Sequence, residues 1–179
     1  MMNYADIKPI DIANGPGVRV SLFVSGCTHK CKGCFNPETW DFDYGNKFTE
    51  KVERDLLYYC KKSYIRGLSI LGGEPLHPEN AIIISRIIHN FKCEFPEKDV
   101  WLYSGYTYEY ILDYINKNID NNLTFAYKYI LNMIDVLVDG PFIEDLKNLN
   151  LRFRGSSNQR LIDMKKTMAT SKVVLWNEE

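Results

Sequence analysis

Four short apolar segments recur along this chain, and each leads into a loop that contains glycine. The segments are residues 18–24, 67–71, 99–103 and 136–138. Short apolar runs bounded by turn residues are typical of strands that are buried on both faces of a parallel sheet. The loops that follow them contain GCTHKCKGC, GGEP, YSGY and DGPF. Because parallel sheets place ligand sites at the carboxyl ends of their strands, we expect these loops to meet at one edge.

Segments with helical periodicity alternate with these strands. Residues 48–62 fit an amphipathic helix with Thr49 as a candidate N-cap. Residues 78–92 open with proline and carry an apolar stripe, which also indicates a helix. Further helices are expected at residues 107–117 and within residues 120–134, and a last strand at residues 173–176.

This alternation of strands and helices predicts an α/β fold with a parallel sheet. The chain has 179 residues, so we expect one domain over residues 1–179. A complete barrel of eight βα units needs about 250 residues. The prediction is therefore an incomplete (partial) βα barrel or a curved open parallel sheet.

Composition excludes several classes of protein. The formal net charge is −1, which gives no broad attraction to nucleic acid or to an anionic membrane. The first residues lack the cationic and apolar regions of a signal peptide, and no apolar run reaches the roughly 18 residues of a membrane span. We expect a cytoplasmic protein that binds neither nucleic acid nor membrane.

Three of the five cysteines lie in one loop directly after the first apolar segment. Cys27, Cys31 and Cys34 have the spacing C-x3-C-x2-C. In a cytosolic chain such a group indicates metal binding or redox chemistry rather than a disulfide framework. Iron–sulfur clusters ordinarily use four cysteine thiolates. Three on one loop mean that a fourth ligand lies elsewhere or that one iron is open to another molecule.

Structural zinc is the main alternative for this loop. A structural zinc ion takes four protein ligands, and His29 or His77 can complete a Cys3His set. Such sites usually combine two knuckles, whereas this chain has one group of ligands. Cys60 and Cys93 lie in or beside helical segments, where isolated cysteines are usually small core residues; we assign them no role.

Two motifs together resemble the radical S-adenosylmethionine (radical SAM) superfamily. They are the C-x3-C-x2-C loop after the first strand and GGEP after the second. Longer segments resemble one family within it, the activating proteins of anaerobic (class III) ribonucleoside-triphosphate reductases. Gly33 also resembles that family, since many other superfamily members have an aromatic residue before the third cysteine. The segments are NGPGVRVSLFVSGCTHKCKGCFNPETW, GGEPLHPEN, VWLYSGYTYE, VLVDGPF and RFRGSSNQR.

The resemblance implies a radical SAM fold and one [4Fe–4S] cluster per chain, held by Cys27, Cys31 and Cys34 as the catalytic centre. Its open iron would chelate the methionine end of S-adenosylmethionine. An electron from a flavodoxin or ferredoxin would then cleave the S–C5′ bond, and the resulting radical would remove hydrogen from a glycine of the partner reductase. A hetero-tetramer with the reductase dimer is implied as well. The nearest alternative is an activase of another glycyl-radical enzyme, similar to that of pyruvate formate-lyase.

The same resemblance implies a set of cofactor-contacting residues. Some of them have a plain structural role as the alternative: a tight turn at Gly72 and Gly73, a helix start at Glu74, a turn at Asn36 and core packing for Phe35. The residues are Gly33, Cys34, Phe35, Asn36, Gly72, Gly73, Glu74 and Ser104.

The sequence allows two alternative roles for each of three further features. Arg19 begins the first strand and can pair with a carboxylate or lie at the surface. Asp139 can face the site or form the turn before Gly140. Residues 14–19 and 155–160 are polar and rich in glycine, so each is a plain loop or a segment that docks substrate or closes over the cofactor.

Overall fold

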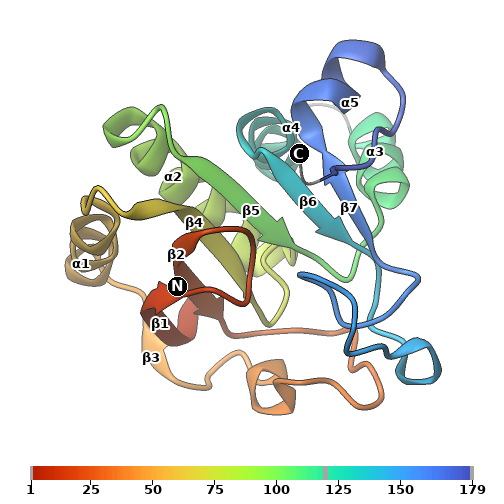
Figure 1. The fold of residues 1–179 in the computed structure, drawn as a ribbon, viewed down its shortest axis with the longest axis horizontal. Helices are drawn as coiled ribbons and strands as arrows, with labels where there is room; N and C mark the ends of the chain where they lie inside the picture. The colour runs from red at the N-terminus through yellow and green to blue at the C-terminus, as the bar shows by residue number, and fades with distance from the viewer. Residues whose placement is uncertain (1, 119–120, 178–179) are drawn as a thin grey trace.

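A computed structural model describes residues 2–118 and 121–177 of the chain (Figure 1). Its strands are β1 (Asn3–Asp11), β2 (Val18–Val24), β3 (Asn46–Lys47), β4 (Ile65–Gly72), β5 (Asp99–Tyr103), β6 (Val136–Asp139) and β7 (Arg160–Asp163). Its α-helices are α1 (Glu50–Cys60), α2 (Pro78–Glu94), α3 (Tyr108–Lys117), α4 (Asn122–Met133) and α5 (Met164–Thr170), and short 3-10 helices are η1 (Pro37–Trp40) and η2 (Glu144–Leu146).

The strands form one open sheet in the order β3-β1-β2-β4-β5-β6-β7. The four predicted strands β2, β4, β5 and β6 run parallel, as expected. The sheet as a whole is mixed, because β1, β3 and β7 join it antiparallel. The apolar pattern did not reveal β1, since NYADIKPID is a largely polar strand near an edge and most of its side chains are exposed or half-buried.

The predicted last strand is wrong. Residues 173–176 form an isolated antiparallel bridge between Leu175 and Ile162, and the last regular strand is β7, which begins at the last residue of the segment interpreted as a polar loop, Arg160. Two backbone hydrogen bonds secure the bridge, from Asp163 to Val174 and from Trp176 to Leu161. The four-residue β7 is too short to show a clear period in the sequence.

The helices form where the pattern predicted them. Thr49 caps α1 by accepting a hydrogen bond from the backbone N–H of Val52 at 3.4 Å. The helix α2 begins with Pro78, whose missing N–H costs nothing in a first turn. The region of residues 120–134 contains α4, although position 120 itself lies outside the described residues. Among the described residues, no helix is both long and apolar enough to cross a membrane.

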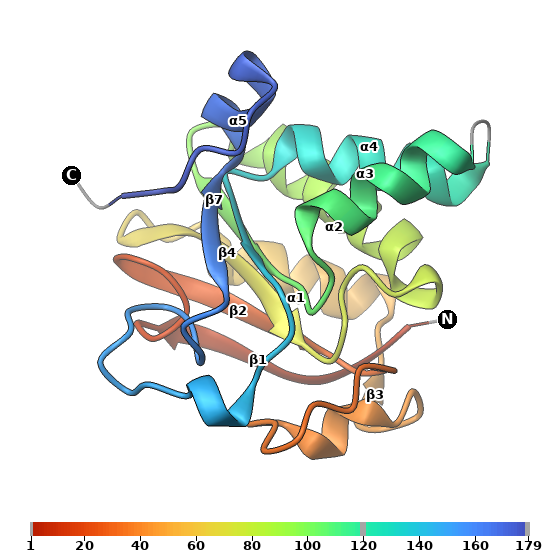
Figure 2. The same cartoon turned by 90° about the vertical axis from the view of Figure 1, so that its right-hand side faces the viewer.

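The helices α1 to α4 lie against one face of the sheet (Figure 2). Side chains alternate along each strand, so Val20, Leu22 and Val24 of β2 enter the main core with these helices. The intervening side chains point to the opposite face, where Trp101 packs with Val138 in a second, smaller cluster. In the described chain, residues 141–159 and the segment after α5 lie over that face. A cavity remains between them and the sheet.

Asp135, which lies just before β6, links α2, α5 and β5. Its carboxylate lies 2.8 Å from Lys92 Nζ of α2 and 2.6 Å from Lys165 Nζ of α5, and it accepts the backbone N–H of Val100 at 2.8 Å. Burial alone raises the pKa of Asp135, but the hydrogen bonds from the two lysines and from Val100 outweigh it and lower the pKa below its ordinary value. The charged carboxylate therefore stabilises the folded chain.

We expect Asp135→Asn to lower the free energy of unfolding by roughly 2–4 kcal/mol, because it removes the counter-charge of the largely buried Lys92 ammonium group. The folded-state pKa is depressed, so this contribution is present above the unfolded pKa and is lost as pH falls through the folded value. Urea denaturation should show the difference at pH 7, and the difference should shrink below about pH 4. Asp55→Asn is the control, since its pair with Lys51 is exposed; an equal loss there would contradict the prediction.

Candidate active site

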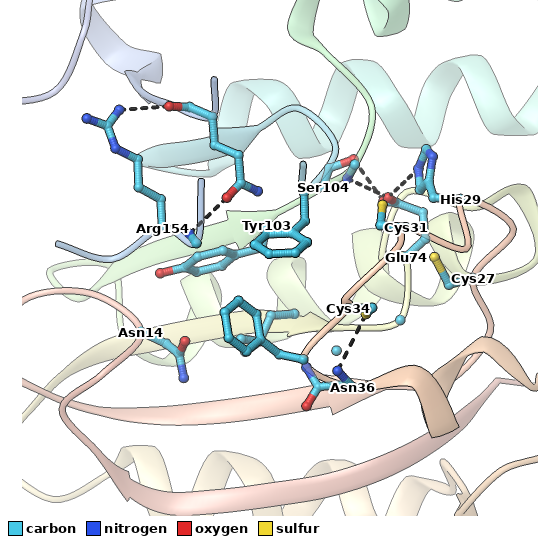
Figure 3. A pocket seen from close by; sticks show the side chains of 18 of the residues that line it. Asn14, Cys27, His29, Cys31, Cys34, Asn36, Glu74, Tyr103, Ser104 and Arg154 are labelled. Carbon is cyan, nitrogen blue, oxygen red and sulfur yellow. Dashed lines mark hydrogen bonds and ion pairs between the residues drawn. The ribbon is translucent and has the colours of Figure 1, made fainter. Parts of the chain in front are cut away.

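The loops that follow β2, β4, β5 and β6 meet at a cavity of about 570 Å³, as their positions after parallel strands predicted. The cavity extends over the face of the sheet opposite helices α1 to α4. Phe23, Leu71 and Tyr103 of the central strands form its floor. Figure 3 shows the three loop cysteines at one end, and Asn14 and Arg154 toward the other. One concave site thus gathers the segments that the sequence singled out.

All three loop cysteines line this cavity. Cys27 is buried and Cys31 and Cys34 are half-buried, and all three are free thiols. Burial raises the pKa of Cys27 to about 11 and also raises that of Cys31. Metal ligation requires thiolates, so metal binding here releases protons.

Backbone amides are directed at the three sulfur atoms. The N–H of Asn36 donates to Cys34 Sγ at 3.4 Å, and the backbone amides of His29 and Lys30 act to lower the pKa of Cys27. The backbone amide of Phe142, in the loop after β6, acts in the same way on the pKa of Cys31. These amides favour the thiolate form, but burial outweighs them at Cys27 and Cys31, whose pKa values are raised overall.

The arrangement differs from a closed single-ion site. Among the described residues, no three His, Cys, Asp or Glu side chains are gathered closely enough to hold one metal ion. His29 Nε2 instead lies 2.9 Å from Glu74 Oε2, and His77 caps α2 while its ring packs on Phe42. Each histidine that was a candidate fourth zinc ligand thus has another partner. A multi-iron cluster suits the three thiols better, because each thiolate can bind its own iron.

Close backbone packing holds the cysteine loop against the GGEP loop. The N–H of Gly73 donates to Val24 at 2.7 Å, and the N–H of Glu74 donates to Gly26 at 2.8 Å. A Cβ atom on Gly73 would lie 2.6 Å from the carbonyl oxygen of Gly26 and 3.0 Å from that of Thr39. Only glycine fits at this close approach. The tight-turn role considered for the glycines is therefore real, and Gly72 and Gly73 also line the cavity.

Glu74 links the ends of β4 and β5 to the cysteine loop. Its buried carboxylate accepts the backbone N–H of Leu76 at 2.8 Å, the hydroxyl of Ser104 at 2.8 Å and the N–H of Gly105 at 2.7 Å, besides its contact with His29. Both carboxylate oxygens are thus bonded within the protein. Glu74 and Ser104 lie in the cavity wall, and these contacts indicate that they position the loops.

The other predicted cofactor residues fall into two groups. Phe35 and Asn36 line the cavity together with Cys34. Gly33 lies outside the lining: its φ is +71°, and a Cβ atom there would lie 2.8 Å from the Glu144 carboxylate. The backbone conformation and the neighbouring loop therefore explain glycine at this position.

Two polar groups that sequence reasoning missed also belong to the cavity. The hydroxyl of Tyr103 and the indole nitrogen of Trp40 are buried, with no hydrogen-bond partner among the described residues. Burial raises the pKa of Tyr103, which keeps it neutral. Unpaired buried polar groups are costly, so they are candidate contacts for a bound ligand. The sequence could have indicated Tyr103, because it is the last residue of a predicted strand and directly precedes a loop that contains glycine.

Arg19 and Asp139 are both ion-paired inside the protein. The guanidinium of Arg19 is fully buried and lies 2.5 Å from Asp99, so the carboxylate-pairing interpretation is confirmed and the surface alternative is wrong. Asp139 is buried, pairs with Arg160 at 2.5 Å and accepts the N–H of Tyr108. It therefore joins β6, β7 and α3 beside the cavity.

Residues 141–159 form a flap over the cavity. Phe142, Leu151, Phe153, Arg154, Gly155 and Gln159 belong to the cavity lining. The predicted polar loop forms the base of the flap: Gln159 accepts the N–H groups of Gly155 and Ser156 and donates to the carbonyl of Gly140, while Asn158 donates to that of Pro141. This segment thus holds the flap over the site.

Comparisons with known proteins agree with this geometry. A family model described as a 4Fe-4S single cluster domain matches residues 13–162. The anaerobic ribonucleoside-triphosphate reductase-activating protein of Vibrio cholerae is 42% identical over 88% of this chain and 96% of its own length. Proteins of the same name from Enterobacteria phage T4 and Escherichia coli K12 are 44% and 42% identical, over 89% and 88% of this chain and 93% and 96% of their own lengths.

We expect Glu74→Gln to lower the free energy of unfolding by roughly 1–3 kcal/mol, because an amide nitrogen cannot accept the N–H of Gly105. Urea denaturation measures the loss. Glu79→Gln, at an exposed position in the first turn of α2, is the matched control and should change stability by about 0.5 kcal/mol or less. Similar losses in both variants would contradict the linking role of Glu74.

Proposed function

Because this chain belongs to the family of anaerobic ribonucleoside-triphosphate reductase-activating proteins, we propose that it generates a glycyl radical on such a reductase. Its cofactors in this proposal are S-adenosylmethionine and one [4Fe–4S] cluster. The observation that carries the proposal is the position of Cys27, Cys31 and Cys34 in one cavity with the Gly72–Gly73 backbone. The matching 4Fe-4S family model supports the iron–sulfur part.

When bound, the cluster supplies one electron for cleavage of the S–C5′ bond of S-adenosylmethionine, which yields methionine and the radical that takes hydrogen from glycine. Cys27, Cys31 and Cys34 would hold the cluster as its three protein ligands. The amide donors from residues 29, 30, 36 and 142 stabilise the thiolates. Gly73 lines the cavity, so the backbone of the GGEP loop would be available to the methionine end.

Other residues of the chain shape the remainder of the cavity. Tyr103 and Trp40 offer unpaired hydrogen-bonding groups to the nucleoside part of S-adenosylmethionine. The aromatic rings of Phe35 and Phe142 pack 5.1 Å apart at the cavity edge, where they would shield the bound cofactor from one side. Exclusion of water matters because a carbon radical must reach its target hydrogen before a side reaction occurs.

The fold suits this assignment. An open sheet with helices on one face and the site at the ends of its parallel strands supports a partial βα barrel of radical SAM type. We propose that the chain forms one such domain over residues 1–179. The free thiols fit a reducing compartment, so the proposed location is the cytoplasm. A flavodoxin or ferredoxin is the proposed electron donor, and a hetero-tetramer with the reductase dimer is the proposed assembly.

Replacement of Cys27, Cys31 or Cys34 by alanine should abolish reductive cleavage of S-adenosylmethionine and greatly reduce bound iron. The wild-type chain should bind about four irons after anaerobic reconstitution, with broad brown absorption. Cys93→Ala is the matched control because Cys93 is exposed and outside the cavity, and Cys60→Ala should likewise retain cleavage. Cleavage of S-adenosylmethionine by the Cys31→Ala protein would contradict the cluster assignment. Stoichiometric zinc in a colourless wild-type protein would contradict it as well.

Electron paramagnetic resonance tests the reaction itself. The chain, mixed anaerobically with its cognate reductase, S-adenosylmethionine and a reductant, should produce a glycyl radical on the reductase. Omission of any one component should remove the signal. A cluster-containing chain that cleaves S-adenosylmethionine without producing this radical would show that the partner is a different protein.

A further inference from the structure

We propose that the outer side of the flap, residues 143–149, is the docking surface for the protein substrate. This inference rests on the proposed function and extends it, because it assigns the contact with the reductase to particular side chains. The flap occupies the lower right of Figure 1, next to the loop that carries Cys27, Cys31 and Cys34.

The flap is a hydrogen-bonded structure rather than a loose loop. Lys147 and Ser156 form an antiparallel bridge, flanked by bonds from Asn148 N–H to Gly155 at 3.2 Å and from Ser157 N–H to Leu146 at 2.9 Å. The hydroxyl of Ser156, which is fully buried, accepts the N–H of Ile143 at the base. A segment held in this way can present a defined surface.

The two sides of the flap differ in their surroundings. Phe142, Leu151 and Phe153 face the cavity. Large apolar side chains on the intervening stretch are exposed instead: Leu149 by 86%, Leu146 by 41% and Ile143 by 39%. Single exposed apolar residues are ordinary, but three within seven residues beside a cavity mark a contact surface.

Continuity with the cysteine loop identifies the occupant. The ring of Phe142 packs on Phe35, which is itself 57% exposed and lines the cavity beside the cysteines. The Lys32–Glu144 pair, at 3.1 Å, also joins the flap to the cysteine loop. The exposed apolar side chains therefore border the cavity where the reaction takes place. A small molecule in the cavity does not need exposed apolar side chains beside it. A folded protein that inserts one glycine-bearing loop into the cavity contacts this rim, formed by Ile143, Leu146 and Leu149.

Apolar contact is the main interaction that this rim offers. The exposed Lys32–Glu144 pair lies within this chain and contributes little to the stability of the flap. Lys147 lies over the ring of Phe35 at 5.1 Å. The chemistry that fits is an apolar patch on the reductase around the loop that carries the target glycine.

The test compares Leu149→Asp with Phe125→Asp, an equally drastic change at a 58% exposed position of α4 on the helix-covered side. Anaerobic biolayer interferometry should show binding to the cognate reductase weakened by roughly tenfold or more for Leu149→Asp alone. Leu149→Met should restore it. Cleavage of S-adenosylmethionine with a chemical reductant, which needs no reductase, should remain at the wild-type rate in all three variants.

The outcomes separate this inference from the function on which it rests. Undiminished reductase binding by Leu149→Asp, with glycyl-radical formation intact, would overturn the docking surface and leave the proposed function standing. If Leu149→Asp instead converts a dimer of this chain to monomer in light scattering while reductase binding is unchanged, the surface joins two copies and the inference is wrong. Failure of the wild-type chain to produce a glycyl radical would count against the proposed function itself.

Discussion

The buried carboxylate of Glu74 is the contact on which the candidate site depends. It receives hydrogen bonds from the end of β4, from Ser104 and Gly105 after β5, and it contacts His29 in the cysteine loop. A buried acid with this many donors is stable only when all of them are in place. Three loops that are distant in sequence are consequently held in one arrangement, and the thiols take their positions from it.

The placement of the helices decides where a ligand can bind. Since α1 to α4 cover one face of the sheet, the side chains of the other face find partners elsewhere. Trp101 does so with Phe153 and Trp176, but Phe23, Leu71 and Tyr103 form the floor of a cavity. The flap completes the enclosure, and the contact of Phe142 with Phe35 joins the flap to the end of the cavity that holds the three cysteines.

Much of the fold could be predicted because its central strands and helices have clear local patterns. The strand Val18–Val24 and the strand Asp99–Tyr103 have the predicted bounds, and Thr49 caps α1 as expected. The antiparallel strands could not be found in the same way. β1 is polar and β7 is only four residues long, so their pairing depends on neighbours rather than on periodicity.

The amino-acid sequence by itself determined the ligand chemistry: three thiols at a fixed spacing, glycines for close approach, and four loops at strand ends that parallel pairing brings together. These are local properties of residue type and spacing. Only the tertiary structure decided that Glu74 and Ser104 bond to each other, that Gly33 faces Glu144, and that residues 155–160 hold a flap. Such roles depend on which side chains meet across the fold, and no spacing along the chain specifies those meetings.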